Sequence, residues 1–162
     1  EQLKGVRRNM ARVMARAHAQ VVPTPLSDDA DIHAWLPGND ITVRLIRSLL
    51  RACQAVPALN AWFDGENLTR TLHPHVDIGI AVDTDDGLFV PALRNADVLD
   101  AAGVRAAVVA AGKGRHQMTP VMGGFESHKV IPLSLTFDHR AATGGEAARF
   151  LKVMLDDLAR PA

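Results

Sequence analysis

The stretch Leu133-Ser-Leu-Thr-Phe-Asp-His-Arg-Ala-Ala-Thr-Gly-Gly-Glu146 joins a strand to a helix through a loop that carries ionisable side chains. Leu133, Leu135 and Phe137 alternate with polar residues, which is the pattern of a strand with one buried face. Apolar residues then recur at helical spacing over 146–159. This strand–loop–helix unit predicts a layered domain in which helices cover a sheet.

His139 stands in the loop where the predicted strand ends. An imidazole with a reference pKa of about 6.5 is suited to accept a proton near neutral pH. Two interpretations of His139 stay open at this point: a catalytic base, or a loop histidine that only bonds the backbone. Thr143-Gly-Gly-Glu146 fits a capping box, so Thr143 is predicted to cap the helix that follows.

The rest of the chain alternates between helix-like and strand-like stretches, which predicts an α/β domain. Helices are predicted over 3–20, 42–55, 98–115 and 146–159, and strands over 26–33, 59–63, 68–72, 76–83 and 130–138. Residues 121–129 fit neither pattern clearly. No internal repeat and no low-complexity linker interrupts the chain, so residues 1–162 are expected to form a single domain.

Composition excludes several classes of protein. Lys plus Arg and Asp plus Glu number 18 each among 162 residues, so the formal net charge is zero. A dedicated nucleic-acid binder would be basic. No apolar run reaches the length of a membrane span. The single cysteine excludes an intrachain disulfide framework and a cysteine-rich zinc module.

Charged residues gather at two further places. A basic stripe on the first helix, made of Arg8, Arg12 and Arg16, is interpreted as a solvated helix face, with contact to an anionic ligand or a neighbouring subunit as the alternative. Three carboxylates, Asp28, Asp29 and Asp31, crowd the strand after it. Alternation divides them between both faces, so a solvated edge strand is favoured over a metal site.

The remaining histidines and the cysteine receive structural interpretations. Cys53 lies on the apolar stripe of its helix and is predicted to be a small core residue. His73 and His75 alternate on one segment but lack a third nearby ligand, so no metal site is predicted there. His116 and His128 flank the ambiguous segment and have no evident partner.

Several segments together resemble one family. His139-Arg-Ala-Ala-Thr-Gly144 is similar to the His-Arg-x-x-Asp-Gly signature of the acyltransferase (E2) subunits of 2-oxoacid dehydrogenase complexes. Residues 3–14 resemble the segment that opens their catalytic domain, and Val56-Pro-Ala-Leu-Asn-Ala61 resembles their Pro-x-Leu-Asn-Ala element. Residues 78–97 closely resemble their central hairpin. The matches follow the family's order and cover most of the chain.

The resemblance implies a chloramphenicol-acetyltransferase-like two-layer sandwich, with helices on one side of a mixed β-sheet. It implies a homotrimer or larger core with active sites between subunits, working with a 2-oxoacid dehydrogenase E1-type enzyme. The implied reaction moves an acyl group between dihydrolipoamide and coenzyme A, with His139 as general base. The lipoyl group would sit on a separate domain, and in biosynthetic relatives a carrier-protein phosphopantetheine thiol takes part instead. We expect no metal, nucleic acid or membrane, and a location in the bacterial cytoplasm.

Two departures from the family pattern bear on activity. The family's Asp, in some members Asn, four residues after the histidine is Thr143 in this chain. Arg7, at the place of the arginine that pairs with the acid, is therefore expected to lack that ion pair. After Pro120, the segment that carries the family's oxyanion-stabilising serine has no counterpart. Val121-Met-Gly-Gly-Phe125 matches either the family's Met-x-Gly-Gly-Thr-Phe or the later turn before the last strand. The alternative function is therefore an E2-like scaffold or docking core with impaired catalysis.

Overall fold

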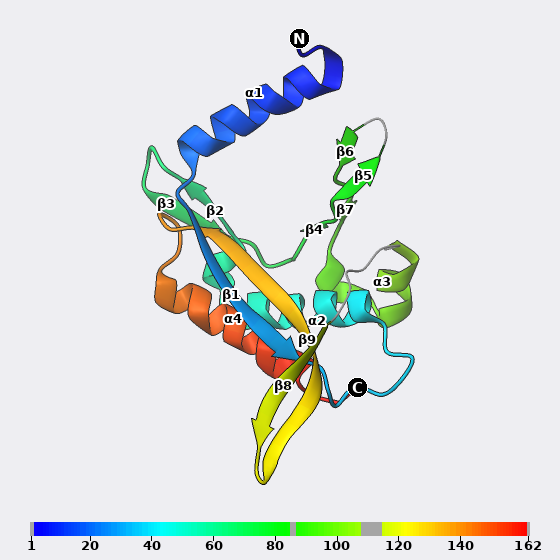
Figure 1. Ribbon diagram of the computed structural model, residues 1–162. Coiled ribbons are helices and arrows are strands. Elements are labelled where there is room, and N and C mark those ends of the chain that lie inside the picture. The colour runs from blue at the N-terminus through cyan, green and yellow to red at the C-terminus, as the bar shows by residue number, and fades with distance from the viewer. Residues whose placement is uncertain (1, 85–86, 108–114, 162) are drawn as a thin grey trace.

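The computed structural model describes residues 2–84, 87–107 and 115–161 (Figure 1). Its helices are α1 (Gly5–Gln20), α2 (Ile41–Ala55), α3 (Ala101–Ala107) and α4 (Gly144–Leu158). Its strands are β1 (Pro23–Asp31), β2 (Ala61–Asp64), β3 (Thr69–Leu72), β4 (Ile78–Gly79), β5 (Val82–Thr84), β6 (Gly87–Phe89), β7 (Ala92–Leu93), β8 (Arg115–Val121) and β9 (Gly124–Asp138). Two 3-10 turns cover Pro57–Leu59 and Ala96–Val98. None of the described helices is both long and apolar enough to cross a membrane.

The long strand β9 organises the main sheet, whose order is β1-β9-β8. β1 runs antiparallel to the second half of β9, from Pro23 opposite Asp138 to Asp31 opposite Val130. β8 runs antiparallel to the first half and forms a hairpin that extends away from the helices (Figure 1). β1 is an edge strand, as the sequence predicted. Proline has no N–H to donate to a neighbouring strand, so it is tolerated at an edge, where one side of the strand has no partner. Pro23 can therefore belong to β1, which starts three residues before the predicted residue 26.

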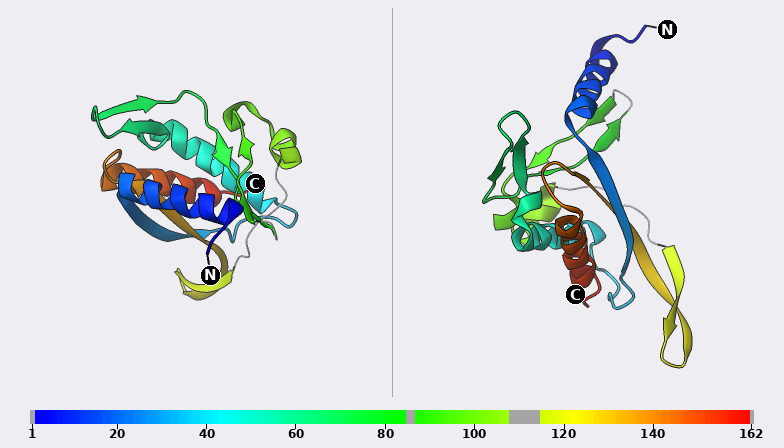
Figure 2. Two further views of the ribbon diagram at one scale, coloured as in Figure 1. Left: turned by 90° about the horizontal axis from the view of Figure 1, so that it is seen from above. Right: turned by 90° about the vertical axis from the view of Figure 1, so that its left-hand side faces the viewer.

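Helices α2 and α4 pack side by side against one side of this sheet (Figure 2). This arrangement confirms the predicted two-layer fold, and the strand pairs found in the described ranges are antiparallel. α2 begins where the carboxylate of Asp40 accepts hydrogen bonds from the backbone N–H groups of Thr42 and Val43. The predicted helices over 42–55 and 146–159 are thus confirmed within two residues at each end.

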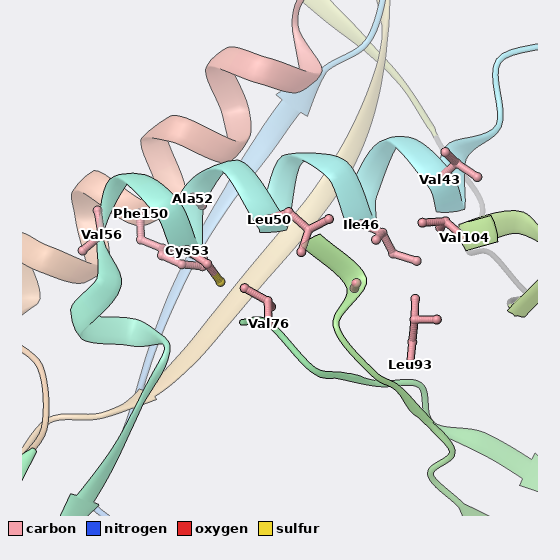
Figure 3. Packing of buried hydrophobic residues seen from close by; sticks show 11 residues of the cluster. Val43, Ile46, Leu50, Ala52, Cys53, Val56, Val76, Leu93, Val104 and Phe150 are labelled. Carbon is pink, nitrogen blue, oxygen red and sulfur yellow. The ribbon is translucent and has the colours of Figure 1, made fainter. Parts of the chain in front are cut away.

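The largest core cluster lies between α2, α4 and the segments that follow α2 (Figure 3). Ile46, Leu50 and Cys53 line the inner face of α2 and meet Val76 and Phe150. The spacing of three and four residues along α2 puts its apolar side chains on one face, which is why this helix buries them together. A second cluster, made of Ala30, Ile32, Ile131 and Leu158, joins the sheet to the end of α4.

Three sequence predictions need correction. The alternating run 76–83 is not one strand: it is divided between β4, which pairs with β7, and β5, which pairs with β6. The helix predicted over 98–115 is observed only as α3, and Arg115 already belongs to β8; residues 108–114 lie outside the described residues. The ambiguous segment 121–129 is the turn and first part of the β8–β9 hairpin.

Helix α1 projects away from the rest of the chain (Figures 1 and 2). Its predicted extent is confirmed, but none of its residues is buried. Val6, Val13 and Met14 on its apolar stripe each expose more than half of their surface. The apolar face of α1 is therefore not covered by any other element in the described part of this chain.

Candidate active site

His139 directly follows the last residue of β9. Its backbone N–H donates to the carbonyl of Val22 at 2.9 Å, which continues the β1–β9 pairing one step beyond the ladder. Its ring lies 5.5 Å from the ring of the buried Phe137, at an interplanar angle of 35°. The side chain of His139 is exposed. The fold thus holds the backbone at His139 in place while leaving the imidazole accessible.

The residues on either side of His139 bind each other. The Arg140 guanidinium donates to the Asp138 carboxylate at 2.8 Å from Nη2 and at 3.1 Å from Nε. Arg140 also donates to the carbonyl of Gln20 and lies over the ring of Phe63, 5.3 Å from its centroid. The backbone N–H of Val22 also donates to the Asp138 carboxylate, at 3.2 Å. We call Asp138 and Arg140 with these contacts the Asp138–Arg140 clamp.

Electrostatics keep the clamp ionised. Burial by itself raises the pKa of the Asp138 carboxyl. Hydrogen bonds from Arg140 and Val22, with the positive charge of Arg140, outweigh that effect and hold the pKa below the ordinary Asp value. The sequence predicted a strand ending at Asp138 and a loop after it, but not the pairing of Asp138 with Arg140. The signal for this pairing in the sequence is that an acidic and a basic residue stand on either side of His139.

Thr143 caps helix α4 as predicted. Its hydroxyl accepts from the backbone N–H of Glu146 at 3.2 Å, while its own backbone N–H donates to the Glu146 carboxylate at 2.8 Å. This reciprocal pair is a capping box. The bond from the Thr143 backbone is the main reason that the pKa of the Glu146 carboxyl is lowered. Arg70 lies 3.6 Å from the same carboxylate and donates to the carbonyl of Ala141 at 2.8 Å.

Arg7 lies apart from these residues. It is exposed on α1, and among the described residues it forms no ion pair. Figure 1 shows the N-terminal end of α1 pointing away from α4, whose cap is Thr143. Within one chain the structure therefore brings His139 and Thr143 into one loop and leaves Arg7 outside it.

Two hollows flank the loop, and His139 lines neither of them. The inner one has a volume of about 310 Å³ and is walled mainly by apolar side chains, among them Leu49, Cys53 and Phe137. The outer one lies between the clamp, the end of α1 and the hairpin residues Trp62 and Phe63. The exposed imidazole of His139 therefore lies outside both of these pockets.

No oxyanion donor from the far part of β9 reaches His139. Ser127 lies near the start of β9, opposite Met118 in the β8–β9 hairpin. His139 lies just beyond the other end of the same strand. Within one chain Ser127 therefore lies at the far end of β9 from the proposed base.

The other chemically interesting residues have structural settings. Cys53 is buried in the main core as predicted, and burial raises the pKa of its thiol to about 11. His75 Nδ1 lies 2.9 Å from the Asp97 carboxylate, and His73 packs edge-on against Trp62. The basic stripe on α1, namely Arg8, Arg12 and Arg16, is exposed.

One prediction about histidines was wrong. His128 was expected to have no partner, but its Nδ1 lies 2.5 Å from the Asp31 carboxylate and its ring stacks on that of His33. Strand pairing, which the sequence did not reveal in this ambiguous segment, brings these residues together. The side chain of His116 lies outside the described residues.

Comparison with known proteins identifies the family. The family model described as "2-oxoacid dehydrogenases acyltransferase (catalytic domain)" matches residues 38–115 and 104–162. The acetyltransferase component of the acetoin cleaving system of Bacillus subtilis is 30% identical over 168 aligned residues, covering 75% of this chain and 42% of that protein. The chain spans half or less of the length of three of the curated relatives it matches, at 42%, 50% and 40%. The chain belongs to the family of 2-oxoacid dehydrogenase acyltransferase catalytic domains.

Solved structures confirm the fold. Dihydrolipoamide acetyltransferase of Azotobacter vinelandii superposes with a TM-score of 0.81 at 22% identity, covering 98% of this chain and 91% of that one. That structure was used to study the catalytic role of a serine, a histidine and, four residues after the histidine, an asparagine. A chloramphenicol acetyltransferase superposes with a TM-score of 0.56 at 13% identity, covering 86% of this chain and 89% of that one.

Proposed function

We propose that this protein is an acyltransferase that moves an acyl group between two thiols, with His139 as the general base. The observation that carries the proposal is the setting of His139: a backbone fixed by the bond to Val22, an exposed imidazole, and the Asp138–Arg140 clamp on both sides. Membership of the acyltransferase family supports the reaction class.

The proposed step begins with the acceptor thiol, whose reference pKa of about 8.5 leaves it mostly protonated at neutral pH. His139 accepts the thiol proton, and the thiolate sulfur attacks the thioester carbonyl carbon. A tetrahedral intermediate forms and collapses, the original carbon–sulfur bond breaks, and the protonated imidazole returns the proton to the leaving thiolate. The thiols proposed are dihydrolipoamide on a separate lipoyl domain, coenzyme A, and the phosphopantetheine of a carrier protein.

Thr143 has a supporting role in this proposal, whereas Arg7 would support the site only through contacts with another copy of the chain. The spacing of His139 and Thr143 equals that of the histidine and asparagine studied in the Azotobacter enzyme. Thr143 places its hydroxyl at the cap of α4 and so fixes the end of the catalytic loop. A threonine carries no charge, so the proposed site works without an ion pair between this position and Arg7.

We further propose that residues 1–162 form one acyltransferase domain from which the family's segment after Pro120 is absent. In support, β8 passes Pro120 directly into a tight hairpin with β9. Trypsin should release a peptide from His116 to Lys129, since Arg115 and Lys129 bound it. Detection of that peptide by mass spectrometry supports the direct junction, and its absence from a complete digest contradicts it.

We propose that the site is completed by other copies of the chain in a homotrimer or larger core that works with an E1-type enzyme. The unpartnered apolar stripe of α1 and the open surroundings of His139 support this. Replacing Val13 on that stripe with aspartate should shift the sedimentation coefficient toward that of a monomer. An unchanged assembly would contradict a role for α1. A bacterial cytoplasmic location stays a prediction.

A second candidate function is a scaffold or docking core with impaired catalysis. The position of Ser127, at the far end of β9 from His139, favours it, because loss of an oxyanion donor typically costs about 2.7–4 kcal/mol of transition-state stabilisation. Assembly would look the same in both cases, so activity decides between them.

The deciding experiment follows transfer of the acetyl group from acetyl-coenzyme A to dihydrolipoamide, and separately to pantetheine, by chromatography of the acetylated acceptor. His139→Ala should abolish transfer without changing the circular dichroism spectrum, because the side chain is exposed. His75→Ala is the matched control, since it removes an exposed histidine elsewhere. Turnover by His139→Ala equal to that of the wild type rejects the proposed base, and no turnover by the wild type favours the scaffold.

A further inference from the structure

A group of potential metal ligands lies at the far end of β9 from His139. One ligand atom from each of His33, Glu126 and His128 lies within 4.8 Å of the others. Glu126 and His128 are two residues apart on β9, so their side chains point to the same face. The group thus combines two imidazoles and a carboxylate on one face of the sheet.

Strand pairing explains why His33 joins residues so distant in sequence. The β1–β9 ladder ends with Asp31 opposite Val130. One step further, the backbone N–H of Ile32 donates to the carbonyl of Lys129 at 2.9 Å. The next position, His33, therefore falls opposite His128. Their rings stack with centroids 4.2 Å apart and an interplanar angle of 9°.

Asp31 fixes the ring of His128 and the backbone of His33. Its Oδ2 lies 2.5 Å from His128 Nδ1, and its Oδ1 accepts the backbone N–H of His33 at 2.9 Å. A carboxylate on one ring nitrogen sets the tautomer and leaves the other nitrogen free to bind a metal, an arrangement common around zinc-bound histidines. The other nitrogen of His128, Nε2, lies 3.6 Å from Glu126 Oε2, on the side where the ligand atoms meet.

We propose that His33, Glu126 and His128 bind a divalent transition-metal ion such as Zn²⁺, with Asp31 as the positioning residue for His128. Two histidines and a glutamate with an open fourth position are an established zinc-binding set. Bonds of about 2.0–2.2 Å require ligand atoms about 3.4 Å apart in a tetrahedron. His33 and Glu126 are exposed, so rotation of their side chains closes the group around the ion, and water takes the fourth position.

The ion would fasten the end of β1 to the projecting β8–β9 hairpin. Glu126 belongs to the part of β9 that pairs with β8, whereas His33 follows β1. Because His139 lies beyond the opposite end of β9, this site is separate from the proposed active site. Its role is to hold the hairpin, and acyl transfer does not pass through it.

The test is titration of chelator-treated, full-length protein with Zn²⁺ by isothermal calorimetry, and with Co²⁺ by visible absorption. The wild type should bind one ion per chain, and Co²⁺ should give the absorption of a tetrahedral site. His33→Ala, Glu126→Gln and His128→Ala should each weaken binding by at least 100-fold. Asp31→Asn should weaken it by about 10- to 100-fold, the range typical of residues that orient a ligand.

His75→Ala is the matched control, because it removes a different histidine that pairs with an aspartate, Asp97. Its Zn²⁺ affinity should equal that of the wild type. The proposal is overturned if the wild type takes up no stoichiometric Zn²⁺, or if His33→Ala and Glu126→Gln bind as the wild type does. Both of those side chains are exposed, so these two variants keep the test valid even if His128→Ala unfolds.

Discussion

Arg140 and Asp138 form an ion pair that spans the residue between them, with Arg140 Nη2 2.8 Å from Asp138 Oδ2. Because that intervening residue is His139, we expect the pair to influence how the loop presents the imidazole. If His139 is the base, replacing Arg140 with alanine should lower the acyl-transfer rate by roughly 10- to 100-fold, because the proposed base loses its alignment. Initial rates of formation of the acetylated acceptor measure the effect. Arg140→Lys should recover part of the rate, since lysine keeps the charge but not the planar fork.

The control for that prediction is Lys152→Ala, which removes a cation paired with Asp156 on the outer surface of α4. Its rate should match the wild type. A full rate in Arg140→Ala would show that the clamp has no influence on His139.

The cap of α4 should contribute measurably to stability. Thr143→Ala removes the hydroxyl that accepts from the Glu146 backbone, and such losses cost about 1 kcal/mol. Urea unfolding should show this as a lower midpoint with an unchanged slope. Thr143→Ser restores the hydroxyl and should restore the midpoint. Equal midpoints for the alanine and serine variants would contradict the capping role.

Acid should weaken the clamp before it unfolds the rest of the chain. The pKa of Asp138 is held below its ordinary value of 3.8, so the folded state binds protons less readily than the unfolded state. Its contribution to stability is therefore complete above the ordinary value and is lost as the pH falls through the lower folded value. Urea unfolding over roughly pH 5 to pH 2 should show this loss.

Asp138→Asn tests the source of that acid dependence. This variant keeps the shape of the side chain but cannot ionise, so part of the decline in unfolding free energy below the ordinary pKa should disappear. A decline identical to that of the wild type would assign the acid sensitivity to other carboxylates.

Cys53 should resist alkylation in the folded protein. Its side chain is 8% exposed, and a thiol with a pKa of about 11 has very little thiolate near neutral pH. Iodoacetamide should leave the native protein unlabelled and label it fully in urea, as intact mass measures. Rapid labelling of the native protein would contradict the packing of α2.

Phe150 and Phe125 form a natural pair for testing the core. Phe150 is 2% exposed within the main cluster, whereas Phe125 is 71% exposed on the hairpin. Phe150→Ala should reduce the free energy of unfolding by about 3–5 kcal/mol. Phe125→Ala should change it by less than about 0.5 kcal/mol. Similar values for the two variants would show that the cluster does not dominate stability.

The sequence predicted correctly those features that depend only on residues close together in the chain. The apolar stripe of α2, the capping box at Thr143 and the strand that ends before His139 are all local, and all three are found. It failed where pairing decides the structure: alternation over 76–83 could not show that β4 and β5 have different partners. The contact between His33 and His128 depends on strand register, which the sequence does not display.

If other copies of the chain cover the apolar stripe of α1, as proposed, its helical state depends on protein concentration. A helix of 16 residues with no buried side chain is close to the length at which isolated helices are marginal in water. Whatever covers its apolar stripe would then stabilise the helix by mass action. The order of the N-terminal segment would become a property of the assembled particle, and dilution would melt α1 while β9 and its two helices stayed folded.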